Sequence, residues 1–201
     1  MQASAVILAA GRSRRMGEAK LALPFRGDTV LGCVLRVLAR PGIAERVIVL
    51  GHHRKRIEPI LDAARVSGPP LMVVTNPDPE GNMASSVRIG VGACSTGSDY
   101  FLITPGDLPA LDARSVDCLL EEAGRTARLK RPPVLVPVCG GHTGHPLAVP
   151  ERLRADILAS QPGWMLRNLV FEGIYPVHEV EVDDEGIFRD FDLPSDRHGL
   201  E

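Results

Sequence analysis

The chain has 201 residues, 44% of them hydrophobic, which is enough to bury a substantial core. Its formal net charge of −2 and its pI near 6.3 give it no general attraction for nucleic acid or for an anionic membrane surface. No apolar run approaches the roughly 20 residues that a membrane span requires, and the N-terminus lacks a secretory signal pattern. We therefore expect a single domain over residues 1–201, located in the cytoplasm, without a nucleic-acid or membrane partner.

Short apolar runs alternate along the chain with longer segments of helical periodicity. Strands are predicted at Ala5–Leu8, Val47–Leu50, Leu71–Thr75, Tyr100–Ile103 and Val134–Val138. Helices are predicted at Val30–Ala39, Ile57–Ala64, Met83–Ala93 and Ser115–Ala127. Such alternation favours crossover connections, so the fold class is α/β: a doubly wound, mainly parallel sheet flanked by helices.

The pattern changes after Gly144-His145-Pro146. A strand is predicted at Leu147–Val149, then helical material to about Val170, then extended segments near His178–Val182 and Ile187–Phe191. No low-complexity linker or repeat separates this region from the rest. We expect it to complete the same domain and to add antiparallel strands at the edge of the sheet.

Cysteine and histidine do not indicate a metal cluster. The cysteines lie far apart, without a C-x-x-C pair, and are predicted to be small core residues: Cys33, Cys94, Cys118 and Cys139. Histidines occur in the pair His52-His53 and on either side of Thr143-Gly144, as His142 and His145. No cysteine or carboxylate cluster at metal spacing accompanies them, so metal ligation is the less favoured interpretation.

The most informative segment follows the first predicted strand. Residues 8–20 read Leu-Ala-Ala-Gly-Arg-Ser-Arg-Arg-Met-Gly-Glu-Ala-Lys. Gly11 and Gly17 allow main-chain N–H groups to approach an anion. The same segment supplies positive charge from Arg12, Arg14, Arg15 and Lys20. It has neither the Gly-Lys-Ser/Thr ending of a P-loop nor the tight G-x-G-x-x-G of a dinucleotide binder, so it predicts a phosphate-binding loop of another type.

A carboxylate follows the strand predicted at Tyr100–Ile103. Asp107 stands in the sequence Thr-Pro-Gly-Asp-Leu-Pro, at the carboxyl end of that strand. A Gly-Asp pair alone is typical of a turn. Beside a triphosphate, whose oxygens can complete an octahedron, a carboxylate oxygen is a suitable ligand for Mg²⁺. The combination of Asp107 with the basic loop predicts a magnesium site.

A second acidic segment, Arg-Asp-Phe-Asp-Leu-Pro-Ser-Asp, occupies residues 189–196. In an extended strand Asp190 and Asp192 face the same side, so either could join Asp107 at the metal. Asp192 is the favoured candidate. The alternative interpretation is a solvated acidic tail.

Together these motifs resemble the MobA-like nucleotidyltransferase family, over nearly the whole chain. The Ala9-Ala10-Gly11 form of the loop is similar to the branch that transfers a cytidylyl group to molybdenum cofactor, whereas members that use GTP carry glycine at the position of Ala10. Asn76-Pro77, followed by Asn-Met-Ala-Ser-Ser at residues 82–86, resembles the segment that seats base and sugar, with Asn82 in place of a glycine. Ser85 and Ser86 could equally begin a helix.

The resemblance implies a Rossmann-like nucleotidyltransferase that moves CMP from CTP onto a phosphorylated acceptor and releases pyrophosphate. The acceptor would be molybdopterin or molybdenum cofactor, and a molybdenum enzyme could receive the product. The nucleotide-binding half would span about residues 1–110 and the acceptor half about residues 111–201. The implied catalytic residues are Arg15, Lys20 and Asp107, with Mg²⁺ on Asp107 and Asp192. The implied nucleotide-binding residues are Leu8, Ala9, Ala10, Gly11, Ser13, Arg15, Lys20, Asn76 and Ser86, and the implied acceptor-binding residue is His145.

Two alternatives remain open. The segment Gln161–Arg167 lacks the acidic residue that the family carries on the acceptor side, so a sugar phosphate or polyol phosphate could replace the pterin. Trp164 within it could stack on a flat acceptor, although a lone tryptophan beside apolar residues more often packs in a core. A non-catalytic carrier or insertion factor for molybdenum cofactor is the other alternative. Arg15, Lys20 and Asp107 argue against it, because a carrier has little use for a metal–triphosphate clamp.

Overall fold

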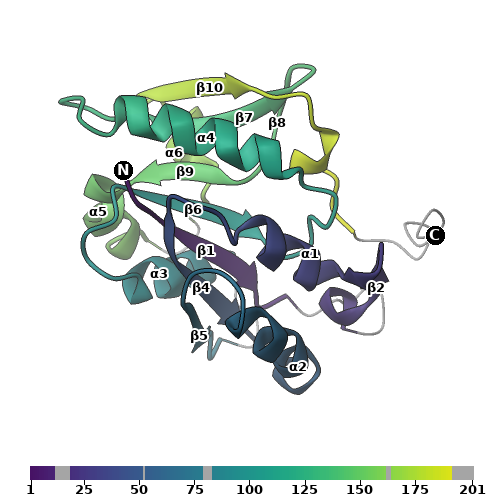
Figure 1. Cartoon of the computed structure of the whole chain (residues 1–201). Helices are drawn as coiled ribbons and strands as arrows, with labels where there is room; N and C mark the ends of the chain where they lie inside the picture. Colours follow the sequence, from purple (N-terminus) through teal and green to yellow (C-terminus); the bar gives the residue numbers. More distant parts are fainter. Residues whose placement is uncertain (12–18, 52, 79–82, 162–163, 192–201) are drawn as a thin grey trace.

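The computed structural model describes residues 1–11, 19–51, 53–78, 83–161 and 164–191. Strands of the main sheet are β1 (Ala3–Ala9), β4 (Ile43–Leu50), β5 (Leu71–Thr75), β6 (Tyr100–Pro105), β7 (Val134–Cys139), β8 (His142–Thr143), β9 (Leu147–Pro150) and β10 (Val177–Glu181). They form an eight-stranded sheet in the order β10-β7-β9-β6-β1-β4-β5, with β8 paired to β7 (Figure 1). A separate antiparallel pair consists of β2 (Pro24–Phe25) and β3 (Asp28–Thr29).

Helices cover both faces of this sheet (Figure 1). One apolar cluster joins the sheet to α1 (Val30–Val37), α2 (Arg54–Arg65) and α4 (Ala113–Thr126). The other cluster joins it to α3 (Met83–Ala93), α5 (Arg154–Leu158) and α6 (Asn168–Phe171). In β1, Ala5 and Ile7 belong to the first cluster and Val6 to the second, as the two-residue period of a strand requires. The predicted fold class, α/β with a mainly parallel sheet flanked by helices, is confirmed.

Strand β9 runs antiparallel to its neighbours β6 and β7 and lies between them, inside the sheet. The two-residue strand β8 is also antiparallel to β7. The expectation of antiparallel strands at the edge was therefore wrong for β9, and the edge strand β10 is parallel to β7. The chain reverses after β7 at Gly140 and Gly141, whose φ angles of 57° and 79° suit a tight hairpin turn. Because β9 runs against its neighbours, its first residues lie at the same edge as the carboxyl ends of β1 and β6.

The extended segment predicted at Ile187–Phe191 was also wrong. A short 3-10 helix occupies Glu185–Ile187, and residues 189–191 form no strand. One cause is local: the side chain of Asp184 accepts a hydrogen bond from the backbone N–H of Gly186 at 2.8 Å, which competes with strand pairing. Similarly, the helical material expected up to about Val170 consists of the separate short helices α5 and α6.

Arg46 is a charged residue in the middle of β4 and is only 1% exposed. Its guanidinium donates hydrogen bonds of 2.7–3.2 Å to the backbone carbonyls of Leu35, Ala64, Ser67 and Pro69. Leu35 and Ala64 lie in the last turns of α1 and α2, where carbonyls lack helical partners and the helix dipole is negative. Burial lowers the pKa of Arg46, and these carbonyls compensate the buried charge.

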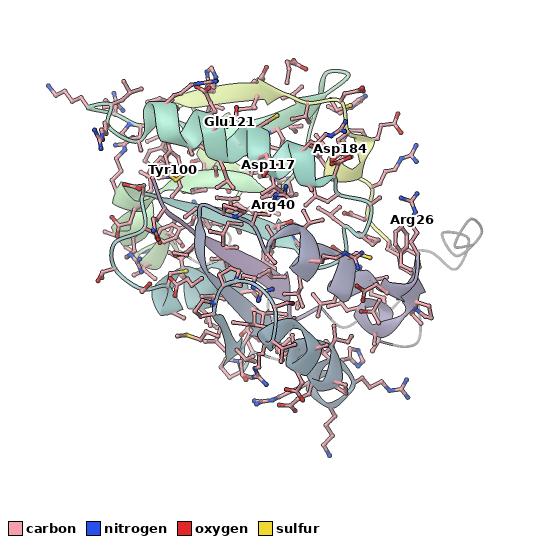
Figure 2. All side chains as sticks on the ribbon, viewed as in Figure 1. Arg26, Arg40, Tyr100, Asp117, Glu121 and Asp184 are labelled. Carbon is pink, nitrogen blue, oxygen red and sulfur yellow. The ribbon has the colours of Figure 1, made fainter. Side chains whose placement is uncertain are left out.

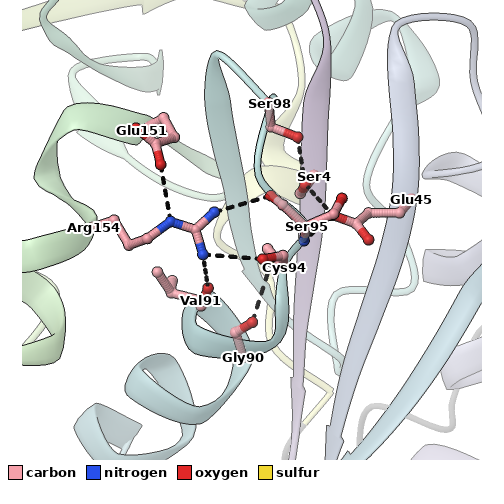
Figure 3. Close-up of polar contacts among 9 residues, drawn as sticks. All are labelled: Ser4, Glu45, Gly90, Val91, Cys94, Ser95, Ser98, Glu151 and Arg154. Atoms are coloured by element: carbon pink, nitrogen blue, oxygen red, sulfur yellow. Dashed lines mark hydrogen bonds and ion pairs between the residues drawn. The ribbon is translucent and has the colours of Figure 1, made fainter.

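Other polar contacts fasten the helices to each other and to the sheet. Arg40, just after α1, makes a two-pronged ion pair with Asp117 of α4, with N···O distances of 2.6 and 2.7 Å (Figure 2). On the opposite face Arg154 of α5 donates to the carbonyls of Val91 and Cys94 at the end of α3 (Figure 3). These contacts hold the elements around the sheet at fixed positions.

A polar cluster lies beside that arginine, at the edge of the sheet where β1 begins. Ser4 and Ser95 both donate hydrogen bonds of 2.7 Å to the carboxylate of Glu45 (Figure 3). Burial by itself would raise the pKa of Glu45, but these hydrogen bonds and the charge of Arg154 outweigh it and lower the pKa. The cluster therefore favours the ionised form of Glu45 in the folded protein.

Cysteine placement corrects one expectation. Cys33 and Cys94 are buried and Cys139 is partly buried, but Cys118, on α4, is exposed.

Among the described residues, no helix is both long and apolar enough to cross a membrane.

Candidate active site

A cavity of about 240 Å³ lies beyond the carboxyl ends of β1 and β6, and we call it the β1–β6 cavity. The chain passes from β1 to β4 on one side and returns to β6 on the other, so these ends form the switch point at which open α/β sheets bind ligands. The cavity is lined by Leu8, Ala9, Ala10, Gly11, Lys20, Leu21, Met83, Ser86, Pro105 and Asp107. Most of the residues predicted to bind nucleotide are thus gathered in one place.

Close backbone contacts shape this cavity. The N–H of Gly106 donates to the carbonyl of Leu8 at 3.0 Å, which joins the end of β6 to the end of β1. Gly51, after β4, lies against the loop: a Cβ at this position would stand 2.5 Å from the carbonyl oxygen of Ala10. Any side chain at position 51 would push Ala10 out of the cavity wall.

Lys20 and Asp107 form an ion pair inside the β1–β6 cavity. The ammonium of Lys20 contacts Oδ2 of Asp107, and the two side chains are only 14% and 18% exposed. Oδ1 of Asp107 is buried and has no hydrogen-bond partner among the described residues. An ionised oxygen without a partner is costly to bury, and it is a suitable ligand for a hard cation. In the described part of the chain, no group of three or more His, Cys, Asp or Glu could hold a metal.

Asn76 contributes to the site through another residue. It is buried outside the cavity lining, and its side-chain amide donates to the hydroxyls of Ser85 at 2.8 Å and Ser86 at 3.0 Å. Its backbone N–H donates to the carbonyl of Leu50 at the end of β4. Asn76 thereby fixes the start of α3 against the sheet and holds Ser86 at the cavity wall.

A second cavity, of about 300 Å³, lies between the end of β6 and the start of β9, and we call it the β6–β9 cavity. Most of its wall is apolar, and the lining residues are Met83, Pro105, Val136, Thr143, Gly144, His145, Leu147, Met165, Leu166, Arg167, Phe188 and Asp190. Met83 and Pro105 line both cavities. Two ligands, one in each cavity, would therefore meet at these two residues.

His145 reaches this place because of the register of β9. Leu147 pairs with Ile103, so the antiparallel ladder continued by two residues brings His145 opposite Pro105. The backbone N–H of His145 donates to the carbonyl of Ile187 at 2.7 Å. Nδ1 of its imidazole is buried without a hydrogen-bond partner among the described residues.

The protonation state of His145 follows from its surroundings. Burial lowers the pKa of His145, and a hydrogen bond with the backbone of Ile103 and the negative charge of Asp107 offset this only in part. Its imidazole is therefore neutral near neutral pH. A neutral imidazole can orient a ligand by hydrogen bonding but adds no charge to the β6–β9 cavity.

Some predicted site residues lie elsewhere. Ser13, Arg15 and Asp192 fall outside the described residues. Asp190 lines the β6–β9 cavity, whereas Asp107 lines the β1–β6 cavity, and without a strand at residues 189–191 the alternation argument for Asp190 and Asp192 does not hold. Trp164 packs against the apolar cluster on the α3 side of the sheet and is not part of the cavity wall.

Sequence reasoning gave no role to Arg167, Phe188 or Met83 individually. Arg167 lies in the segment that departs from the family pattern, and Met83 stands within the segment matched after Asn76. Their presence at the cavity walls depends on the positions of α3 and of the loop before α6. No short motif encodes those positions.

Residues 5–171 match the family described as the MobA-like NTP transferase domain. A nicotine blue oxidoreductase from Paenarthrobacter nicotinovorans is 30% identical over 204 residues, covering 97% of this chain and 94% of the relative. A molybdenum cofactor cytidylyltransferase from Escherichia coli (strain K12) is 25% identical over 191 residues, covering 95% and 91%.

Solved structures share the fold. The Rv0371c protein from Mycobacterium tuberculosis H37Rv superposes with a TM-score of 0.81 at 25% identity, covering 100% of this chain and 98% of that one. A manganese complex of the same protein gives a TM-score of 0.74 at 24% identity, covering 100% and 98%. The match over residues 5–171, with phosphate-loop residues, lysine and carboxylate around one cavity, identifies the chain as a member of the MobA-like NTP transferase family.

Proposed function

We propose that this chain transfers CMP from CTP to a phosphorylated acceptor that carries a flat heterocyclic ring system, of which molybdopterin and molybdenum cofactor are the favoured examples. The observation that carries the proposal is the pair of cavities that meet at Met83 and Pro105. One contains Lys20, Asp107 and the backbone of the phosphate loop, and the other is a mostly apolar cavity beside it. A molybdenum enzyme would receive the product.

In the proposed reaction, a phosphate oxygen of the acceptor attacks the α-phosphorus of the nucleotide. A bond to phosphorus forms, and the bond between the α-phosphorus and the bridging oxygen of pyrophosphate breaks. A phosphate monoester is largely dianionic at neutral pH, since its second pKa is about 6, so the attack needs no protein base. Lys20 and Arg15 would hold the triphosphate and stabilise the negative charge that develops on pyrophosphate.

Asp107 suits a divalent cation, because it offers a buried carboxylate oxygen without a partner among the described residues. Phosphate oxygens and Asp192 would complete the shell in our proposal. When bound there, Mg²⁺ would neutralise charge on the phosphates. Lys20 belongs to η1 (Lys20–Ala22) and Asp107 follows the end of β6, so two different elements position the phosphate-binding and the metal-binding side chain.

The preference for CTP rests on Ala10. Ala10 belongs to the wall of the β1–β6 cavity, and its backbone lies against Gly51. We propose that the methyl group of Ala10 narrows the space for a bicyclic guanine and leaves room for cytosine. Discrimination by one methyl group in a tight pocket is about 1–3 kcal/mol.

The acceptor class rests on the chemistry of the β6–β9 cavity. Hydroxyl groups of a sugar or polyol placed against Val136, Leu147 and Leu166 would lose water without gaining hydrogen bonds. A flat heterocycle would contact these side chains and use Thr143, His145 and Arg167 at its polar edge. The 25% identity to a molybdenum cofactor cytidylyltransferase supports the same class.

Residues of both proposed halves, 1–110 and 111–201, line the β6–β9 cavity, which supports treating the two halves as one domain.

The test is pyrophosphate release with CTP, GTP, ATP and UTP in the presence of Mg²⁺. Acceptors would be molybdopterin, molybdenum cofactor and a panel of sugar and polyol phosphates. We expect release with CTP and a molybdenum cofactor species. Release only with a sugar or polyol phosphate would overturn the acceptor class, and binding of the pterin without release from any nucleotide would favour the carrier alternative.

Two variants connect that assay to the site. Lys20→Ala should slow release by about 10²–10³-fold, the size typical of losing one preorganised donor. Asp107→Ala should abolish release and retain the native circular dichroism spectrum, because Asp107 lies at the end of a strand and not in the core. Near-normal release by a folded Asp107→Ala variant would remove Asp107 from the proposed metal site.

A second candidate function is reduction of an aromatic substrate. The nicotine blue oxidoreductase, 30% identical over 97% of this chain, favours it, and the apolar β6–β9 cavity suits an aromatic ring. Oxidation of NADH or NADPH in the presence of nicotine blue would be measured in parallel. Reductase activity that survives Asp107→Ala, without pyrophosphate release by the wild type, would replace the transferase proposal.

A further inference from the structure

The ion pair between Lys20 and Asp107 brings together two residues that are 87 positions apart. Lys20 opens the short helix η1, and Asp107 follows β6. Both side chains are largely shielded from water, with 14% and 18% exposure. Among the described residues that line the β1–β6 cavity, Lys20 and Asp107 are the charged ones, and each lies against the opposite charge of the other.

A divalent cation cannot bind well to Asp107 while this pair is intact. The ammonium would stand close to the cation, and repulsion between like charges is strong where water is largely excluded. Oδ2 is already engaged by Lys20, and Oδ1 is buried. Neutralisation of the carboxylate by lysine and ligation of a cation by the same carboxylate therefore compete.

We propose that Lys20 is the resident counter-ion of Asp107 in the nucleotide-free protein and that a triphosphate draws it away, which opens Asp107 to a divalent cation. The long flexible stem and three donors of lysine allow its ammonium to move from carboxylate to phosphate. The inference rests on the proposed function, because it takes the triphosphate as the competing anion.

The consequence is selectivity for the metal–nucleotide complex over the free cation. Without nucleotide, Lys20 keeps the cation out. With nucleotide, the phosphates bind Lys20 and supply ligands to the cation at the same time. Lys20 thus has a role before the reaction that is separate from holding pyrophosphate during it.

The test measures binding of Mn²⁺ alone to the nucleotide-free full chain, from the loss of the electron paramagnetic resonance signal of free Mn²⁺. Lys20→Met removes the charge and keeps much of the side-chain volume, whereas Lys20→Arg keeps the charge. Lys130→Met makes the same change at an exposed position and serves as the matched control. The Mn²⁺ titrations of all variants are run at the same pH of about 8, well above the ordinary pKa of a carboxyl group.

We expect Lys20→Met to bind Mn²⁺ about tenfold more tightly than the wild type, because a nearby like charge has been removed. Lys20→Arg and Lys130→Met should match the wild type. Equal affinity of Lys20→Met and the wild type would overturn the proposal. Tightening by Lys20→Arg as large as that by Lys20→Met would overturn it as well, because charge would then not be the cause.

The double variant Lys20→Met with Asp107→Asn locates the cation. It should lose the gained affinity, and retention of the gain would show that the cation binds away from Asp107 and contradict the proposal. Lys20→Gln has the same expected outcome and replaces Lys20→Met if the latter does not fold, as judged by circular dichroism.

The result is independent of turnover. Pyrophosphate release by the wild type together with unchanged Mn²⁺ affinity in Lys20→Met would refute the counter-ion role and leave the transferase intact. Tighter Mn²⁺ binding by Lys20→Met without pyrophosphate release from the wild type would support the counter-ion role and refute the transferase.

Discussion

The backbone N–H of Phe191 donates a hydrogen bond of 2.9 Å to the carbonyl oxygen of Asp107. Phe191 is also buried against Phe25, with ring centroids 6.0 Å apart in an edge-to-face arrangement. The C-terminal part of the chain is thereby anchored to the residue whose carboxylate we propose to hold the cation. This anchor ends one residue before Asp192.

This anchor makes Asp192 the first residue to test as a second metal ligand. We predict that Asp192→Asn lowers the rate of pyrophosphate release and raises the Mg²⁺ concentration needed for half-maximal rate, because one charged oxygen ligand is lost. Asp183→Asn, at an exposed position after β10, is the control and should change neither quantity. An unchanged Mg²⁺ dependence in Asp192→Asn would leave the second ligand to be sought elsewhere.

Ala10→Gly tests the base preference. The wild type should have a higher kcat/KM for CTP than for GTP, and the variant should narrow the ratio by removing the methyl group from the cavity wall. The expected change is at most about 1–3 kcal/mol in relative transition-state binding. A wild type that prefers GTP would contradict the assignment of the base. An unaltered ratio in the variant would move selectivity to the segment at Asn76–Ser86.

Glu45 should make the free energy of unfolding depend on pH in the acidic range. Its pKa is lowered in the folded state, so its contribution is fully present above the unfolded value of about 4.5 and is lost as the pH falls through the lower folded value. Urea denaturation measures the free energy of unfolding of the wild type and of Glu45→Gln. Between about pH 7 and about pH 3 this free energy should fall less in the variant than in the wild type.

Glu179→Gln, on the exposed edge strand β10, is the control for that comparison and should leave the wild-type pH dependence unchanged. If the free energy of unfolding fell equally with pH in the wild type and in Glu45→Gln, the hydrogen bonds from Ser4 and Ser95 would not favour the ionised carboxylate.

Arg46→Met should destabilise the fold by about 3 kcal/mol, because the buried carbonyl of Leu35 and the carbonyls of Ala64, Ser67 and Pro69 would lose the hydrogen bonds of the guanidinium. Chemical denaturation measures the difference. Arg128→Met, at an exposed position after α4, should remain within about 0.5 kcal/mol of the wild type. If Arg46→Met lowered the free energy of unfolding as little as the control does, water or local rearrangement would satisfy those carbonyls.

The strands of the sheet could be predicted from sequence because apolar, β-branched runs such as Val47–Leu50 are short and bounded by polar residues or turns. The position of β9 within the sheet could not, since its alternation says nothing about direction or neighbours. Arg46 shows the same limit in another way. Its charge gives no hint in the sequence that it closes the ends of two helices.

For the candidate site, residues such as Ala10, Gly11 and Asp107 could be predicted because they follow β1 or β6, whose carboxyl ends lie at one edge of the sheet. The pairing of Lys20 with Asp107 could not, because it depends on where the packing of η1 on α1 and α2 places Lys20. The extended segment at Ile187–Phe191 was wrongly predicted because the backbone there follows from contacts with distant residues, such as the hydrogen bonds of Ile187 with His145 and of Phe191 with Asp107, as well as from the local hydrogen bond of Gly186 with Asp184.

The two cavities draw their described lining residues from different parts of the sequence. Apart from Met83 and Pro105, the described residues that line the β6–β9 cavity all come from position 136 onward, whereas those of the β1–β6 cavity all come from position 107 or before. Under the proposed assignment of the cavities, changes among the residues from position 136 onward that line the β6–β9 cavity would alter which molecule is modified and leave the choice of nucleotide untouched. A chimera that joins residues 1–133 of this chain to the matching C-terminal part of a relative would exchange acceptors at a single crossover point.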